Sequence, residues 1–321
     1  MENKIAIENY KTILAGCSFT YVDIGSRGGL SPEWEQVKDL INVVLFEPDI
    51  DEAKRLKDSS PNGFTVIPKA VWGHKGVVKF NCTRNPSYSS VLEPNISALE
   101  GTFYYSRNFY TVDNVIDIEV DTLEAILKDY NIIQTDFLKI DIQGAENYIF
   151  KSIKNWENIL GVHTEAYGEK LYKDGADISS TLGSLYKNKL QLYEIKIIAG
   201  SPIVDVDNLK MFSKGLLNAR PKSGYKTRPM VYDLLLLKDK IDILNRNEIF
   251  FIRKMIFILC IYNYFDYAIY LLIKSFNQNI FTQKEKDKLI KSITSLHKET
   301  LTRLQNIKEK IRSPSYTLEE R

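Results

Sequence analysis

The sequence reads Tyr21-Val22-Asp23-Ile24-Gly25-Ser26-Arg27-Gly28-Gly29 where a first buried strand is expected, and this stretch decides the fold. An apolar run with one acid predicts the strand, and the glycines after it predict a tight turn. A helix is expected over 31–41, and a second apolar strand, 43–46, ends directly on Glu47. Strand, glycine turn, helix, strand and acid form the layout of a nucleoside-binding crevice in a doubly wound parallel sheet.

The glycine turn and Glu47 each have a physical role in such a crevice. Glycines let the backbone turn sharply and bring its amides close to a ligand. Glu47 follows Gly25 by 22 residues, close to the spacing of an acid that accepts hydrogen bonds from ribose hydroxyls. The pattern Gly25, Gly28, Gly29 is not the G-x-G-x-x-G of dinucleotide enzymes, which makes a nicotinamide or flavin ligand less favoured. An ordinary strand, turn and helix with glycines at its caps is the alternative.

Composition excludes several classes of protein. The chain has 321 residues, of which 44% are hydrophobic, and a formal net charge of +2, so charge gives no case for binding nucleic acid. Its three cysteines are scattered, without a C-x-x-C pair, and three histidines form no H-E-x-x-H helix. A disulfide framework and a cysteine zinc site are therefore not expected, and no metal ligands are assigned.

The hydropathy pattern predicts a cytoplasmic protein. Residues 1–12 are polar and charged, without the apolar core of a signal peptide. The longest uncharged apolar-rich run near the C-terminus, Met255 to Phe265, has 11 residues, whereas a membrane span needs about 20.

Predicted strands and helices alternate over most of the chain. Strands are expected at 66–72, 77–81, 115–120, 136–142, 159–165, 192–198 and 232–237, with 66–72 and 77–81 forming a hairpin. Helices are expected at 51–57, 122–129, 143–155 and 179–189. This alternation predicts an α/β fold with a doubly wound, mostly parallel sheet.

The last 80 or so residues have a different pattern. An aromatic-rich apolar helix is expected over 249–276 and a charged amphipathic helix over 283–312, and the two could form a helical hairpin. Residues 240–321 contain 15 Lys and Arg against 9 Asp and Glu, a net charge of +6, which leaves −4 for the remainder. This asymmetry favours an anionic membrane surface or a partner, and a solvated helical cap or dimer element is the alternative.

Three segments resemble those of the FkbM-type methyltransferases, which use S-adenosylmethionine. They are Asp23 to Gly29, Phe46-Glu47-Pro48 and, most specifically, Phe137-Leu138-Lys139-Ile140-Asp141-Ile142-Gln143-Gly144-Ala145-Glu146. The resemblance covers roughly residues 18–240 and implies a Rossmann-like, seven-stranded sheet of the class I type, whose last strand is antiparallel. Residues 1–240 would form the methyltransferase domain, and 241–321 a helical extension.

The resemblance also implies which residues bind S-adenosylmethionine and its product, S-adenosylhomocysteine. The first loop would hold the methionine end, Glu47 and Pro48 the ribose, and the end of the third strand the adenine. The residues carried over are Asp23, Gly25, Ser26, Arg27, Gly29, Glu47, Pro48, Ala70, Val71, Ser90 and Asp141. Arg27 replaces a commoner asparagine, and Gln143 replaces a common glutamate, which removes one negative charge.

An alcohol acceptor must lose a proton, so methyl transfer to oxygen calls for a base. The candidates are Asp141, Glu146, His163 and Glu165, all near the carboxyl ends of central strands. Each has a structural alternative. Asp141 could cap the helix that follows it, and Glu146 could interact favourably with the dipole of that helix. His163 could be a core residue, and Glu165 could pair with a lysine. A divalent metal held by Asp141, His163 and Glu165 is a further, less favoured reading.

The resemblance suggests O-methylation of a sugar hydroxyl in bacterial surface glycan or polysaccharide biosynthesis. The acceptor would be a glycan or a small molecule, with the C-terminal helices making a peripheral contact with the inner membrane or a homo-oligomer. Aromatic residues of 85–114 could stack on a sugar, and Arg107 could meet a phosphate, or the segment could pack as a lid. The competing functions are an NAD(P)-dependent reductase and a non-catalytic scaffold.

Overall fold

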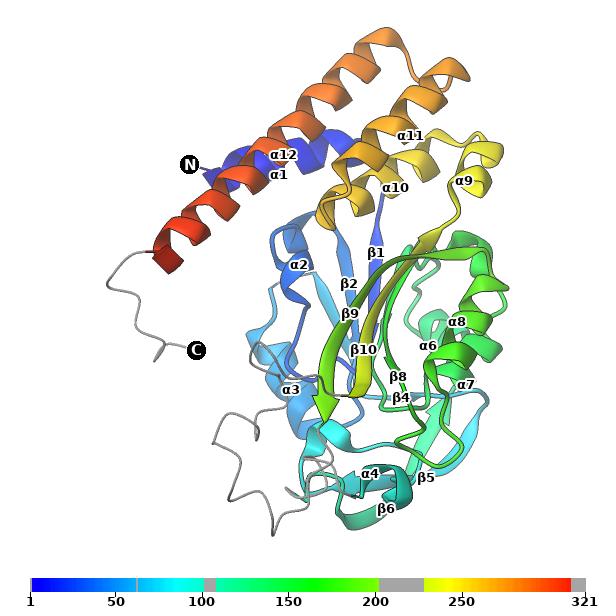
Figure 1. Ribbon diagram of the computed structural model, residues 1–321. Helices are drawn as coiled ribbons and strands as arrows, with labels where there is room; N and C mark the ends of the chain where they lie inside the picture. The colour runs from blue at the N-terminus through cyan, green and yellow to red at the C-terminus, as the bar shows by residue number, and fades with distance from the viewer. Residues whose placement is uncertain (1, 62, 101–107, 202–227, 313–321) are drawn as a thin grey trace. The chain divides into compact units, whose positions relative to one another are not determined.

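The computed structural model describes residues 2–61, 63–100, 108–201 and 228–312 (Figure 1). The chain divides into two compact units. The sheet unit comprises Thr20–Leu30 and Asn42–Asp239, and the helical unit comprises Met1–Phe19, Ser31–Ile41 and Lys240–Arg321. The first 19 residues and 31–41 thus group with the C-terminal helices.

The sheet unit is built on a seven-stranded sheet with the order β3-β2-β1-β7-β8-β10-β9. Its strands are β1 (Thr20–Ile24), β2 (Asn42–Phe46), β3 (Phe64–Ile67), β7 (Phe137–Ile140), β8 (Gly161–Tyr167), β9 (Leu190–Ser201) and β10 (Arg228–Lys238). Neighbours from β3 through β8 pair in parallel, and β10 pairs antiparallel with both β8 and β9. The fold class expected from the sequence, including the antiparallel closing strand, is confirmed.

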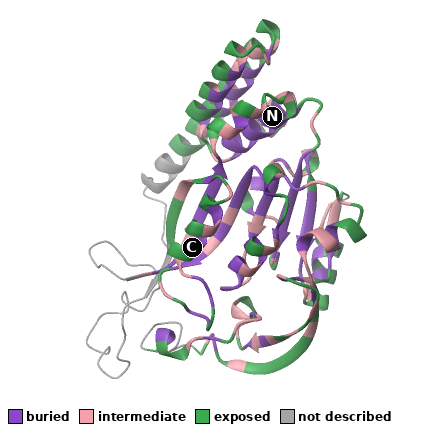
Figure 2. Cartoon of the chain, turned by 90° about the vertical axis from the view of Figure 1, so that its right-hand side faces the viewer, coloured by how far each residue is buried: buried purple, intermediate pink, exposed green. Residues whose placement is uncertain are grey.

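One face of this sheet packs on helices. They are α6 (Leu123–Asp129), α7 (Glu146–Ser152) and α8 (Ile178–Tyr186), and α3 (Ile50–Ser59) follows β2. Alternate strand residues such as Val22, Leu138 and Val162 share a buried core with apolar side chains of α6 and α7. The central strands are mostly buried, as Figure 2 shows. Successive side chains of a strand point to opposite faces of the sheet. The residues that alternate with these core residues therefore point to the other face, where polar side chains of the candidate site lie.

A second, three-stranded sheet has the order β4-β6-β5. Its strands are β4 (Ala70–Val71), β5 (Gly76–Thr83) and β6 (Val112–Asp121). The predicted single strand 66–72 is wrong, because Pro68 and Lys69 separate β3 from β4 and the two strands join different sheets. The predicted hairpin is wrong as well, since β5 pairs antiparallel with β6 instead of with 66–72.

The predicted long irregular segment contains two short helical turns, η2 (Pro86–Tyr88) and α4 (Ile96–Leu99), before β6 begins. Residues 101–107 of this segment, which include Phe103, Tyr104, Tyr105 and Arg107, lie outside the described residues. A further short turn, η3 (Trp156–Asn158), precedes β8.

The helical unit contains the helices at both ends of the chain. Its elements are α1 (Glu2–Leu14), α2 (Pro32–Glu35), η1 (Lys38–Leu40), α9 (Lys240–Arg246), α10 (Ile249–Ile261), α11 (Phe265–Asn277) and α12 (Gln283–Arg312). Helix α1 has no counterpart among the predicted helices, and 31–41 forms two short turns instead of one helix. The helix expected over 249–276 is divided after Ile261, where Asn263 adopts a left-handed φ of 64°. The helix expected over 283–312 is confirmed.

Aromatic side chains form the core of the helical unit. The ring of Phe257 meets those of Tyr10, Phe19 and Trp34 with centroids 5.2–6.3 Å apart. The buried Arg253 guanidinium donates to the carbonyls of Thr12 and Ile13 and to Glu285. These contacts join α1 and α2 to α10 and α12. Among the described helices, none combines the length and the apolar character needed to cross a bilayer.

Candidate functional site

The turn after β1 brings two strand ends into close contact. Gly25 has φ +84°, and a Cβ built on it would lie 1.9 Å from the carbonyl oxygen of Asp141. Its amide and that of Ser26 both donate to the carbonyl of Phe46. Only glycine fits here, because any side chain would displace the backbone that follows β7. Gly28 and Gly29 also have positive φ, so the predicted glycine turn is present.

Glu47 lies buried at the end of β2. Its side chain is 4% exposed, and Oε1 accepts a hydrogen bond from the amide of Asp49 at 3.0 Å. Burial raises the pKa of the Glu47 carboxyl, although the Asp49 amide and Arg27 oppose that shift. A buried carboxylate that can still accept further hydrogen bonds fits a ribose diol, whose two hydroxyl groups would donate them.

Two contacts fasten the glycine turn to the start of α3. Arg27 forms an ion pair with Asp49 at 2.6 Å, and the amide of Gly28 donates to Glu52 Oε1 at 3.0 Å. Asp49 also caps α3 by accepting from the amides of Asp51 and Glu52. The Arg27 guanidinium therefore holds an acid of this protein, beside the position where the resemblance puts the cofactor carboxylate.

Asp23 belongs to a polar row across the sheet. It is fully buried, accepts from Lys139 Nζ at 3.0 Å and lies within 3.3 Å of the Tyr21 hydroxyl. Burial raises the pKa of the Asp23 carboxyl, and Lys139 opposes the rise. In register order, Asp23 on β1 stands beside Lys139 on β7, which stands beside His163 on β8. The Asp23 carboxylate thus lies within the sheet, two residues before Gly25 and the predicted loop.

The loop after β7 has an unusual backbone. Gln143 has φ +59°, which is uncommon for a residue with a side chain, and Gly144 follows at φ +92°. A Cβ on Gly144 would lie 2.7 Å from the ring of Tyr172. The Tyr172 hydroxyl lies 3.0 Å from Gln143 Oε1 and 2.9 Å from the carbonyl of Tyr88, to which it donates. Tertiary contacts therefore hold Gln143 in its strained conformation.

Gln143 joins two of the predicted catalytic carboxylates. Its Nε2 donates to Asp141 Oδ1 at 2.8 Å and to Glu165 Oε2 at 3.4 Å. The Tyr167 hydroxyl also donates to Glu165 Oε2, at 3.4 Å. Burial, together with the charges of Asp141 and Glu146, raises the pKa of the Glu165 carboxyl well above its usual range. Two acids held around one amide form a centre that can accept a proton.

Glu146 has a different environment. It is buried, and its Oε1 accepts from the amides of Ile142 and Gly144, both at 3.1 Å. Burial and the nearby Asp141 raise the pKa of Glu146 to about 7. Its contacts are those of a side chain that shapes the loop after β7.

His163 forms a pair with Asp233 across the β8–β10 ladder. Its Nε2 pairs with Asp233 Oδ1. Among the described residues, no three His, Cys, Asp or Glu side chains are grouped so that they could hold a metal ion. Of the predicted catalytic residues, Asp141 and Glu165 come together, whereas His163 pairs with Asp233.

The remaining predicted cofactor residues lie around these two loops. Ser90 is buried, and its hydroxyl donates to the carbonyl of Gln143 at 2.9 Å. Ala70 and Val71 form β4 in the small sheet, three residues beyond the end of β3. Pro48 follows Glu47 directly, and the Ser26 hydroxyl donates to the carbonyl of Phe46.

A protein-family model, described as the Methyltransferase FkbM domain, matches residues 23–192 of this chain, from Asp23 through the start of β9. The chain belongs to the FkbM methyltransferase family. The match spans the glycine turn, Glu47, the β7 loop and Glu165, so family membership supports S-adenosylmethionine-dependent methyl transfer as the chemistry of this sheet unit.

Three solved structures are similar to the FkbM chain. A protein assigned as a methyltransferase from Thermoplasma acidophilum is 12% identical, with 69% of this chain and 68% of that chain covered and a TM-score of 0.30. A protein assigned as an S-adenosylmethionine-dependent methyltransferase from Listeria monocytogenes is 10% identical, with 74% and 98% covered and a TM-score of 0.34. A precorrin-6y C5,15-methyltransferase from Geobacter metallireducens is 9% identical, with 74% and 87% covered and a TM-score of 0.30. No curated protein sequence matches the chain. The family assignment rests on the domain match.

The residues present fit S-adenosylmethionine. The buried Glu47 provides a carboxylate that can accept from the ribose hydroxyls of a nucleoside. The Asp141 carbonyl fills the space beside Gly25, and the amides of Gly25, Ser26 and Gly28 donate within the protein. These residues lie where β1 and β2 end, and Asp141 lies where β7 ends, which is the ligand-binding edge of an open α/β sheet.

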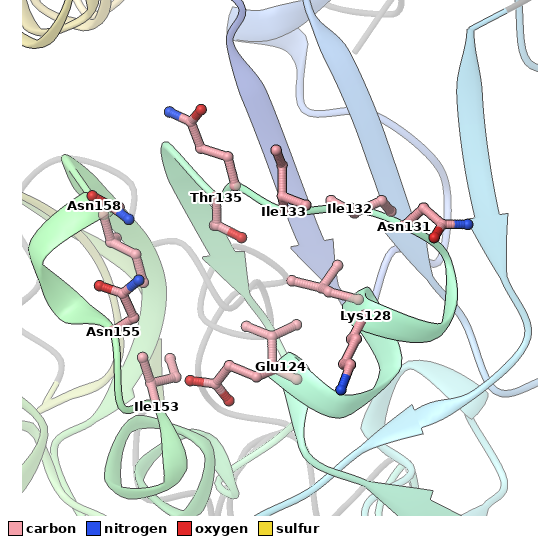
Figure 3. A pocket seen from close by; sticks show the side chains of 13 residues that line it. Glu124, Lys128, Asn131, Ile132, Ile133, Thr135, Ile153, Asn155 and Asn158 are labelled. Carbon is pink, nitrogen blue, oxygen red and sulfur yellow. The ribbon is translucent and has the colours of Figure 1, made fainter.

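A separate pocket of about 390 Å³ lies at the other edge of the sheet unit (Figure 3). Its lining includes Thr135, which precedes β7, and Asn158, which precedes β8. Glu124 and Lys128 on α6 also line it. It therefore opens at the amino ends of the strands and takes no part in the site described above.

Four residues at the site were given no role from the sequence. Lys139 neutralises Asp23, Gln143 joins two carboxylates, Tyr172 holds Gln143, and Asp233 pairs with His163. For Lys139 a signal existed, because a lysine in the middle of an apolar strand needs a buried partner. No local pattern marks Tyr172 or Asp233.

Proposed function

We propose that this protein is an S-adenosylmethionine-dependent O-methyltransferase that acts on a sugar hydroxyl in a bacterial surface glycan or its precursor. The observation that carries this proposal is the Asp141–Gln143–Glu165 array at the carboxyl ends of β7 and β8. A hydroxyl acceptor needs a group that takes its proton, and two carboxylates at the expected edge of the sheet can do so.

The residues divide into binding and proton-accepting groups. Gly25 and its turn would hold the amino-acid end of the cofactor, and Glu47 would bind the ribose. When bound, S-adenosylmethionine would supply an activated methyl group for displacement by an acceptor oxygen. Asp141 and Glu165 would orient the acceptor and receive its hydroxyl proton.

Glu165 is the favoured proton acceptor of the two. Burial and the charges of Asp141 and Glu146 raise its pKa, which makes it a stronger base than an ordinary carboxylate. Gln143 and Tyr167 both donate to its Oε2, and these two donors hold that oxygen in place. Asp141, adjacent to the Gly25 turn, would then position the acceptor.

The charge of the site favours a neutral acceptor. After burial, the charge of Asp141 raises the pKa of both Glu146 and Glu165, and Glu146 adds to the rise at Glu165. An anionic group placed among them would be repelled, whereas a sugar ring brings hydroxyl donors that carboxylates accept. Tyr110, from the aromatic segment, is buried against Tyr88 and Tyr172, so in this region ring packing supports the loop that holds Gln143.

Calorimetric titration tests the cofactor half of the proposal. Wild-type protein should bind S-adenosylhomocysteine, and Glu47→Ala should weaken binding about 10- to 100-fold, because charge-assisted hydrogen bonds to the ribose are lost. The control is Glu119→Ala, which changes an exposed acid of the small sheet. Binding of NADPH in place of the nucleoside would support a reductase, and binding of neither would support a scaffold.

Mass spectrometry tests the acceptor half. Neutral monosaccharides, sugar nucleotides and simple diols would be incubated with S-adenosylmethionine and scored for gain of a methyl group. Methylation of neutral sugars is expected. Methylation confined to amines or to carboxylates would contradict the sugar assignment while leaving the cofactor assignment intact.

A further inference from the structure

Helix α11 presents two different faces. One is buried in the helical unit by Phe265, Ala268, Leu271, Leu272 and Ser275. On the opposite face, Tyr267, Tyr270 and Ile273 are 40%, 41% and 43% exposed. Their spacing of three residues places them along one side of the helix.

Lysines interleave with these tyrosines. Lys240, at the start of α9, has its Nζ 6.0 Å from the ring centroid of Tyr267 and 5.5 Å from that of Tyr270. Lys274 Nζ lies 5.6 Å from the Tyr270 centroid. We call Lys240, Tyr267, Tyr270, Ile273 and Lys274 the tyrosine–lysine face.

We propose that the tyrosine–lysine face binds the surface of an anionic lipid membrane. Tyrosine rings are favoured at the level of lipid headgroups, where an apolar body and a polar tip are both satisfied. Lysine ammonium groups beside them reach lipid phosphates while their methylene stems cover apolar surface. Ile273, and Ile241 at 59% exposure, supply aliphatic side chains for the acyl boundary.

Helix α12 adds positive charge to the same unit. Lys284, Lys288, Lys291 and Lys298 are exposed, at spacings that return to one side of a helix. Asp287 lies in this stripe, where it accepts from Gln283, and Asp266 is the acid on the exposed side of α11. Residues 240–321 have a net charge of +6, so the unit is attracted to an anionic surface at long range.

A second copy of the chain is a poorer occupant. A two-fold interface places the same patch on both subunits, so Lys240 and Lys274 would approach their own copies. Like charges at an interface oppose association, whereas lipid phosphates complement them.

Vesicle sedimentation with the full-length chain tests the inference. The protein should sediment with vesicles of phosphatidylcholine mixed with phosphatidylglycerol, remain free with phosphatidylcholine alone, and be released by high salt. The double variant Lys240→Glu/Lys274→Glu should bind the anionic vesicles at least about tenfold more weakly. Lys75→Glu/Lys128→Glu, which makes the same charge change in the sheet unit, should bind like wild type.

Two further measurements keep the outcomes distinct. Tyr267→Ser/Tyr270→Ser should also weaken sedimentation. If Lys240→Glu/Lys274→Glu loses the circular dichroism spectrum of the folded protein, Lys240→Gln/Lys274→Gln, which removes the positive charges without adding negative ones, takes its place. Equal sedimentation of wild type and face variants would overturn the inference. So would a stable dimer, seen by light scattering without lipid, that dissociates in the tyrosine variant.

Discussion

The carboxylates of the site differ in what holds them, residue by residue. Glu47 accepts from the Asp49 amide, Glu146 accepts from the amides of Ile142 and Gly144, and Glu165 accepts from the side chains of Gln143 and Tyr167. Backbone donors fix a carboxylate in place, whereas side-chain donors can rearrange around an arriving ligand. This difference favours Glu165 over Glu146 as the proton acceptor that we propose.

Glu146→Gln should change the pH dependence of stability. Burial raises the pKa of Glu146 from 4.5 to about 7, so the native state holds a proton that the unfolded chain releases. The stability from this protonated acid is fully present below about pH 4.5 and is lost as the pH rises through about 7. Glutamine mimics the protonated acid, so the variant's advantage should grow toward pH 8, to on the order of 3 kcal/mol.

Urea unfolding across this pH range measures the effect. Glu119→Gln, at an exposed position, should follow wild type at every pH. Stability curves of Glu146→Gln and wild type that stay parallel from pH 4 to pH 8 would contradict the assignment.

Among the elements, the turn after β1 and the loop after β7 depend on each other. The Asp141 amide donates to the carbonyl of Ile24, and the Asp141 carbonyl occupies the space beside Gly25. The two elements that would bind cofactor and acceptor are therefore in direct backbone contact. A change in one turn displaces the other.

Gly25→Ala and Gly28→Ala separate close approach from backbone strain. Both glycines have positive φ, but a Cβ on Gly25 would meet Asp141, whereas one on Gly28 would have nothing within 4 Å. Gly28→Ala should cost about 1 kcal/mol of stability, and Gly25→Ala roughly 3 kcal/mol or more, with loss of S-adenosylhomocysteine binding. Thermal melting and calorimetry would measure both, and equal effects of the two variants would show that the close approach is unimportant.

For the whole molecule, the helical unit draws on both ends of the chain. Helix α1 and Trp34 belong to it through the ring of Phe257 on α10. Removal of the C-terminal helices would therefore expose apolar side chains of α1 and α2 to solvent. The C-terminal helices therefore share one packed core with α1 and α2.

A chain ending at Asp239 should be less soluble and melt at a lower temperature than the full chain. Phe257→Ala, a gentler test of the same core, should cost about 3–5 kcal/mol, since it leaves a cavity beside the rings of Tyr10, Phe19 and Trp34. Leu301→Ala, at a position 46% exposed, should stay within about 0.5 kcal/mol. A truncated chain that melts like the full protein would contradict this account of the core.

The sequence alone determined the class of fold, its strand–helix alternation, the glycine turn, Glu47 at the end of β2 and the FkbM family. These features are local, because burial on one face and a positive φ leave their pattern in neighbouring residues. The division of 66–72 between two sheets was missed, since an apolar run predicts burial but does not say which strand will be its partner.

Only the tertiary structure decided which side chains meet. Lys139 faces Asp23 because β7 lies beside β1, and Glu165 comes within reach of Gln143 because β8 lies beside β7. It also joined α1 to helices more than 230 residues away along the chain. Strand order and helix docking depend on the best burial of whole surfaces, and no short stretch of sequence contains that information.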